Sequence, residues 1–88
     1  MSDSANQLCE RARTGDREAA SELITLFYER IYAYLRRLCA SDEDAADLTQ
    51  DAFIKAFRAL DSFRGDSAFS TWVHRIAVRR CLDLLRAG

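Results

Sequence analysis

Apolar residues recur along most of this chain at spacings of three and four, which is the period of an amphipathic α-helix. The pattern predicts four helices. The first two span residues 4–14 and 17–39. The third begins at residue 42 and runs up to a polar and aromatic stretch at 61–72, within which the fourth helix, 68–86, begins. No segment alternates with the period of two that a half-buried strand requires. The expected fold class is therefore all-α, a compact bundle of about four helices in a single domain.

Polar residues and one glycine mark the predicted helix ends. Gly15 suits the residue after a helix C-terminus, where a positive φ is common, and Asp16 suits the N-cap of the next helix. Ser41 followed three residues later by Asp44 matches a capping-box pattern, and the neighbouring carboxylates complement the positive end of the helix dipole. These signals place helix starts near residues 17 and 42.

Two predicted helices have broad apolar faces, which indicates that each packs on more than one partner. The second helix carries an apolar stripe formed by Ala20, Leu23, Phe27, Ile31, Tyr34, Leu35 and Leu38, widened by Ile24, Tyr28 and Tyr32. The fourth carries an inward face formed by Phe69, Trp72, Val73, Ile76, Ala77 and Leu84, widened by Val78, Cys81 and Leu85.

The third helix divides into an apolar and a polar face on a wheel of 100° per residue. The apolar face consists of Ala45, Leu48, Ala52, Ala56, Ala59, Leu60 and Phe63. The opposite face consists of Asp47, Gln50, Asp51, Ile54, Arg58 and Asp61, with Phe57 at its edge. Ile54 is thus an apolar residue within a polar rim, which is either the centre of a protein contact site or one exposed apolar residue of an ordinary kind.

The stretch 61–72 interrupts two helical segments and carries an unusual combination of residues. It contains Gly65, hydroxyl and acidic side chains, the cation Arg64 and three aromatic residues. Aromatic faces beside a cation suit stacking on unpaired bases, at roughly 1–3 kcal/mol per base. The alternative is that Phe63, Phe69 and Trp72 are core residues that hold the turn in place.

Charge is distributed unevenly although the net charge is only −1. Acidic residues predominate at 41–63 and arginines at 64–88. Arg75, Arg79 and Arg86 fall on one side of the fourth helix and form a basic strip that leads away from the aromatic stretch. Such a strip is either a track for a phosphate backbone or a solvated surface balanced by Asp83.

Cysteine usage and the N-terminus point to a reduced compartment. Cys9, Cys39 and Cys81 are far apart, odd in number and without metal-ligand spacing. The N-terminus lacks the apolar core of a signal peptide, and no run is long enough to cross a membrane. A cytoplasmic protein without membrane association is expected.

Residues 47–77 closely resemble conserved region 2 of the extracytoplasmic-function (ECF) sigma factors, the promoter-recognition subunits of bacterial RNA polymerase. The resemblance is carried by Asp47-Leu48-Thr49-Gln50-Asp51, by Phe63-Arg64-Gly65-Asp66-Ser67-Ala68-Phe69 and by Trp72-Val73-His74-Arg75-Ile76-Ala77. It extends more weakly to Ala12-Arg13-Thr14-Gly15-Asp16. It implies a helical domain that binds polymerase with one face and opened promoter DNA with another.

For the polymerase face, the resemblance implies docking on the coiled-coil clamp helices of the beta-prime subunit. The residues assigned to this contact are Asp47, Gln50, Asp51, Ile54, Phe57 and Arg58. An anti-sigma protein that covers the polymerase-binding surfaces is a further possible partner within this family.

For DNA, the resemblance implies that the loop after the third helix captures a base flipped from the non-template strand of the −10 element. The residues assigned to DNA binding are Phe63, Arg64, Gly65, Asp66, Ser67, Ala68, Phe69, Ser70, Trp72, Arg75, Arg79 and Arg86. Strand separation by base capture requires no ATP and no catalytic residue.

The chain departs from the family pattern in two ways. Arg79 and Arg80 stand where the family usually has a small polar residue and an uncharged one, which puts the identity of the captured base in doubt. Region 4, the domain that reads the −35 element, is absent from residues 1–88.

Two other functions compete with this interpretation. A helical interaction module could compete for polymerase without handling DNA, but such a module would have no reason to keep the stretch from Phe63 to Trp72. An enzyme is disfavoured, because His74 is the only histidine and no nucleophile set, phosphate-binding loop or dinucleotide fingerprint occurs. No cofactor and no metal are expected.

Overall fold

Four α-helices and one short 3₁₀ helix make up the computed structural model, which describes residues 2–63 and 68–87. They are α1 (Ser2–Arg13), α2 (Arg17–Leu38), α3 (Asp42–Arg58), the 3₁₀ helix η1 (Leu60–Ser62) and α4 (Phe69–Ala87). The described residues contain no β-strand. The expected all-α bundle is confirmed, and its helix starts fall within two residues of the predicted positions.

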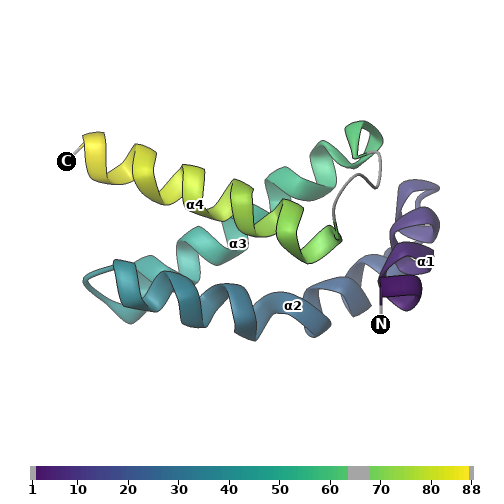
Figure 1. Ribbon diagram of the computed structural model, residues 1–88, viewed down its shortest axis with the longest axis horizontal. Coiled ribbons are helices and arrows are strands. Elements are labelled where there is room, and N and C mark those ends of the chain that lie inside the picture. Colours follow the sequence, from purple (N-terminus) through teal and green to yellow (C-terminus); the bar gives the residue numbers. More distant parts are fainter. Residues whose placement is uncertain (1, 64–67, 88) are drawn as a thin grey trace.

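The helices form an elongated bundle of 37 × 21 × 21 Å. α2 and α4 run in the same direction, and α3 runs in the opposite direction and packs against both (Figure 1). α1 crosses the start of α2 at one end of the bundle, and α4 ends at the other. α3 ends and α4 begins at the α1 end.

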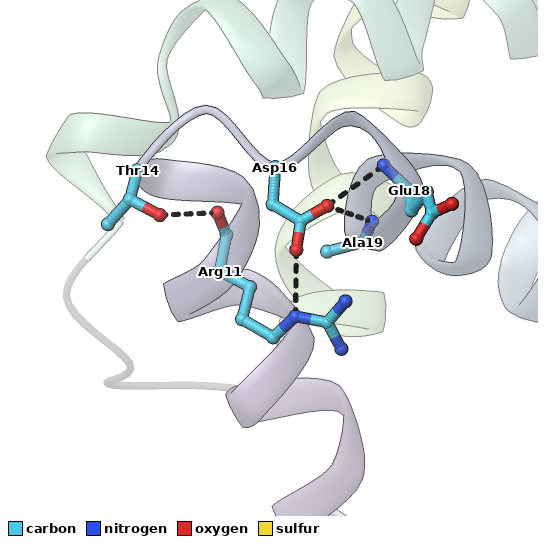
Figure 2. Close-up of polar contacts among 5 residues, drawn as sticks. All are labelled: Arg11, Thr14, Asp16, Glu18 and Ala19. Carbon is cyan, nitrogen blue, oxygen red and sulfur yellow. Dashed lines mark hydrogen bonds and ion pairs between the residues drawn. The ribbon is translucent and has the colours of Figure 1, made fainter.

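The turn between α1 and α2 is held by one glycine and one aspartate. Gly15 has a φ of 101°, which only glycine adopts readily. The Asp16 carboxylate accepts hydrogen bonds from the backbone N–H groups of Glu18 and Ala19 at 3.0 and 3.2 Å, and Arg11 Nε donates to it at 2.9 Å (Figure 2). The predicted glycine turn and N-cap are therefore confirmed.

The start of α3 is capped as predicted. Ser41 Oγ accepts a hydrogen bond from the backbone N–H of Asp44 at 3.1 Å. Asp42 forms an ion pair with Arg36, so the last turn of α2 is tied to the first turn of α3. The short connection between these helices is therefore fixed at both ends.

The core lies where the inner faces of α2, α3 and α4 meet. Its buried residues are Leu8, Cys9, Ala19, Leu23, Ile31, Leu35, Ala45, Leu48, Ala52, Phe53, Ala56, Leu60, Phe63, Phe69, Val73, Ala77 and Cys81. The predicted apolar face of α3 is confirmed except at Ala59. This residue is exposed because α3 ends at Arg58 and the chain turns into η1, which changes the rotation of the following residues.

Two residues of α3 that were assigned to neither face are buried. Phe53 is stacked against Tyr28 of α2, with ring centroids 6.2 Å apart. Thr49 is fully buried, and its hydroxyl donates to the backbone carbonyl of Ala45 at 2.7 Å. This internal hydrogen bond removes the cost of burying an unpaired hydroxyl. The inner face of α3 is therefore wider than its apolar pattern alone indicated.

Several apolar residues expected in the core are exposed, and most of them lie near the far end of the bundle. They are Tyr34, Leu38, Leu84 and Leu85, with exposed fractions between 37% and 61%. The inward face predicted for α4 is thus wrong beyond Cys81, the last buried residue of that helix. No described element covers its final turns. On α2, Ala19 is fully buried, whereas the predicted Ala20 is half-buried.

The Asp16 cap predicts a pH-dependent contribution to stability. The pKa of Asp16 lies below its ordinary value because its carboxylate accepts from the Ala19 N–H and from Arg11. The contribution should therefore be complete above the unfolded pKa of about 3.9 and be lost as the pH falls through the folded pKa. Asp16→Ala should lower the melting temperature at pH 7, and its difference from wild type should narrow below about pH 4.

The matched control for this experiment is Asp83→Ala, which removes an exposed carboxylate that caps no helix N-terminus. A difference between wild type and Asp16→Ala that stays constant from pH 7 to pH 3 would contradict the assigned role of the carboxylate.

Candidate protein and nucleic-acid interfaces

The outer side of α3 carries an exposed strip of four side chains. Asp47, Gln50, Ile54 and Arg58 follow one another at spacings of three and four and are all exposed. Ile54 has 47% of its surface exposed and lies between polar neighbours on both sides. This strip points away from the core, and it brings together four of the six residues that the resemblance assigned to polymerase binding.

The other two residues of that set, Asp51 and Phe57, border the strip. Asp51 is half-buried and accepts a hydrogen bond from Arg80 Nε of α4 at 2.7 Å. Phe57 is also half-buried, and its ring centroid lies 6.4 Å from that of Phe53 and 6.2 Å from that of Phe69. Both side chains are therefore partly engaged within the bundle.

Phe69, the first residue of α4, is fully buried in a cluster of aromatic rings. Its ring centroid lies 5.9 Å from that of Phe27, 6.0 Å from that of Phe63 and 6.1 Å from that of Trp72. With Phe57, these rings come from α2, α3, the end of η1 and α4. The cluster therefore joins α2, α3 and α4 where α3 ends and α4 begins.

The aromatic residues of the stretch 61–72 differ in how deeply they are buried. Phe63 is 6% exposed, and its ring centroid lies 4.8 Å from that of the half-buried Trp72. The rings of Phe63 and Phe69 thus contact other rings, and neither is exposed for stacking on a base. This arrangement agrees with the alternative that these two residues hold the turn in place.

Two further residues assigned to DNA binding lie just before and within the first turn of α4. Ala68 is exposed and Ser70 is half-buried. The assigned residues Arg64, Gly65, Asp66 and Ser67 lie outside the described part of the chain.

Arg13 of α1 contacts the chain just before that segment, a contact that the sequence analysis missed. Its NH2 group donates to the backbone carbonyl of Phe63, and its NH1 group donates to Glu10 at 2.8 Å. The partners Arg13 and Phe63 lie 50 residues apart. The only signal was the weak resemblance at residues 12–16, which gave Arg13 no role.

The basic strip of α4 is confirmed as a surface feature. Its arginines border a shallow groove lined by His74, Arg75, Val78, Arg79, Leu82, Asp83 and Arg86. Arg80 is not part of it, because its guanidinium pairs with Asp51 on α3. The arrangement suits an extended anionic ligand, since three of the cations lie along one helix.

No metal site is found among the described residues. They contain no group of three or more His, Cys, Asp or Glu side chains placed to hold a metal ion. The cysteines are free thiols, and burial raises the pKa of Cys9 to about 11. None of the helices within residues 2–63 and 68–87 is both long and apolar enough to cross a membrane.

Residues 23–88 match the family model of sigma-70 region 2. The chain belongs to this family. It is 46% identical over 80 residues to the ECF RNA polymerase sigma-E factor of Escherichia coli K12, a match that covers 91% of this chain and 41% of the relative. It is also 46% identical over 81 residues to the RNA polymerase sigma-H factor of Pseudomonas aeruginosa, covering 92% and 42%. The chain thus spans about two fifths of the length of these curated relatives.

A solved structure has the same fold. It is the NMR structure of the complex formed by an engineered region 2 of sigmaE with GTAAAA. Its TM-score is 0.86 at 40% sequence identity, and the match covers 94% of this chain and 86% of that chain. The chain therefore has the sequence and fold of sigma region 2 and is similar to ECF sigma factors, as the resemblance indicated.

Proposed function

We propose that this domain recognises the promoter −10 element and separates its strands while it is bound to the polymerase core. The observation that carries the proposal is the similarity, in sequence and fold, to a region 2 domain whose structure contains GTAAAA. The proposed partners are RNA polymerase core, promoter DNA and an anti-sigma protein that covers the polymerase-binding surface. The proposed site of action is the cytoplasm.

The exposed strip of α3 is the proposed contact with the beta-prime clamp helices. Ile54 supplies an apolar centre, and Asp47, Gln50 and Arg58 supply a polar rim that can hydrogen-bond to a partner helix. Binding energy concentrates at apolar positions of this kind when a rim excludes water. Asp51 and Phe57 are proposed to contribute at the border of the strip.

The turn between α3 and α4 is the proposed site of base capture. Extruding a base from a duplex costs a few kcal/mol, which a preorganised pocket offsets by stacking and hydrogen bonds. The buried rings of Phe63 and Phe69 support the two ends of this turn, so they contribute rigidity to the pocket. The direct contacts to the base are assigned to residues 64–67, which the family resemblance places at the base, together with Ser70 and Trp72.

The basic strip is proposed to bind phosphates of the same strand. Arg75, Arg79 and Arg86 are exposed along the groove of α4. Of the two arginines that depart from the family pattern, Arg80 is paired with Asp51 and Arg79 is exposed. Any altered base preference is therefore proposed to arise from Arg79.

For the polymerase face, Ile54→Asp should weaken binding to an isolated beta-prime clamp-helix fragment by about 30-fold or more, the equivalent of about 2 kcal/mol. The expected loss arises because the substitution places an unpaired charge at the apolar centre of the contact. The matched control is Leu26→Asp, another exposed apolar residue, at 55% exposure on α2. Equal affinities for Ile54→Asp and the control, with both proteins folded, would refute the assignment.

For the DNA face, the holoenzyme should bind a single strand that contains GTAAAA more tightly than strands with altered bases, and one position should dominate. Ser67→Ala should reduce the preference for one base more than it reduces the overall affinity for DNA, because the Ser67 side chain is proposed to contact the captured base. Arg86→Ala should weaken all sequences about equally and lower the slope of log affinity against log salt by about 0.7, because Arg86 is assigned to a phosphate. Equal binding of all four bases at every position would contradict base capture.

A further inference from the structure

A second groove opens between α2 and the first turns of α4. It is lined by Arg30, Ile31, Ser70, Thr71, His74 and Arg75. Arg30 is the one cationic residue of α2 that lines this groove, and none of the DNA-binding or polymerase-binding assignments above includes it. The groove shares His74 and Arg75 with the groove along α4, so the two adjoin.

The chemistry of this groove favours an anion. Two arginines from different helices and two hydroxyl side chains line it, and no carboxylate does. Within the described part of the chain, neither Arg30 nor Arg75 takes part in an ion pair. Two exposed guanidinium groups and two hydroxyls together provide a fork of donors that suits a phosphate.

Neighbouring aromatic rings position both sides of the groove. The Arg30 guanidinium carbon lies 5.9 Å from the centroid of the Phe27 ring, which in turn packs on Phe69. On α4, the His74 ring lies 4.4 Å from the ring of Tyr34. The arginine of α2 is therefore supported by the same aromatic cluster that fixes the start of α4.

The groove lies directly beside the proposed site of base capture. Ser70 and Thr71 follow Ala68 and Phe69, the first described residues after the turn. Because this groove shares Arg75 with the groove that Arg79 and Arg86 line, a strand bound near the turn and along α4 would pass it.

We propose that Arg30, Ser70, Thr71 and Arg75 seat one phosphate of the bound promoter strand next to the captured base. This inference rests on the proposed function and extends it, because it assigns α2 a direct role in DNA binding. The seat fixes the direction in which the strand leaves the turn. Arg30 contributes charge and a bidentate donor fork, and the hydroxyls supply shorter-range hydrogen bonds.

The test uses this 88-residue chain and a single strand containing GTAAAA in which one phosphate at a time is replaced by an uncharged methylphosphonate. Wild type should lose about tenfold or more in affinity at the seated linkage, as expected for a lost hydrogen bond to a charged group. Arg30→Ala should bind the unmodified strand more weakly, and its further loss at that one linkage should be clearly smaller than that of wild type, because only Arg75 and the two hydroxyls still contact the phosphate. Its salt slope should be smaller by about 0.7.

The matched control is Arg17→Ala, which removes the same charge from α2 but lies beside Glu18, Ser21 and Glu22, away from this groove. It should retain the full methylphosphonate effect at the seated linkage. Arg30→Lys should recover part of the affinity, because it restores the charge but not the fork. Melting temperatures of all variants should stay close to wild type, since both arginines are exposed.

Two failures can be told apart. If wild type does not prefer GTAAAA to a scrambled strand, in the presence or absence of core polymerase, the proposed function itself fails. If wild type shows the preference, but Arg30→Ala matches Arg17→Ala at every linkage, the phosphate seat is overturned while the proposed function stands.

Discussion

The burial of one ring, that of Phe69, is the constraint on which the rest of the structure depends. Phe69 begins α4, and its ring packs among aromatic residues that come from α2, from α3 and from the end of η1. Large aromatic side chains contribute more buried area than any other residue type, so a small domain gains much of its stability from such a cluster. The cluster fixes where α3 ends and where α4 begins.

This constraint explains how a small helical domain can present two separate faces. The aromatic cluster holds the connection between α3 and α4 at one end of the bundle, while the exposed strip of α3 lies on the outside, away from the core. The Asp51–Arg80 ion pair joins the outer border of α3 to α4. Because the side chains of Arg80 and Asp51 keep 40% and 36% of their surface exposed, the pair adds orientation more than stability. The proposed contacts with a protein on α3 and with DNA along α4 can therefore occur together.

The sequence predicted the fold class, the helix starts and the division of α3 into two faces, because caps and helical periodicity are local properties. It did not predict how far along α4 the neighbouring helices pack against it. Leu84 and Leu85 were therefore assigned to the core although they are exposed. Pairs that are distant in the chain were also missed. Arg13 with Phe63 and Arg80 with Asp51 depend on how helices meet, and no local pattern encodes those meetings.

The central claim is that DNA binds along the turn and α4 while the exposed strip of α3 stays free. NMR titration of the isotope-labelled chain with an oligonucleotide containing GTAAAA tests it most directly. The account predicts that signals of Ser70, Trp72 and Arg75 shift, whereas those of Gln50 and Ile54 keep their positions. Shifts centred on Gln50 and Ile54, or the same response to a scrambled oligonucleotide, would contradict it.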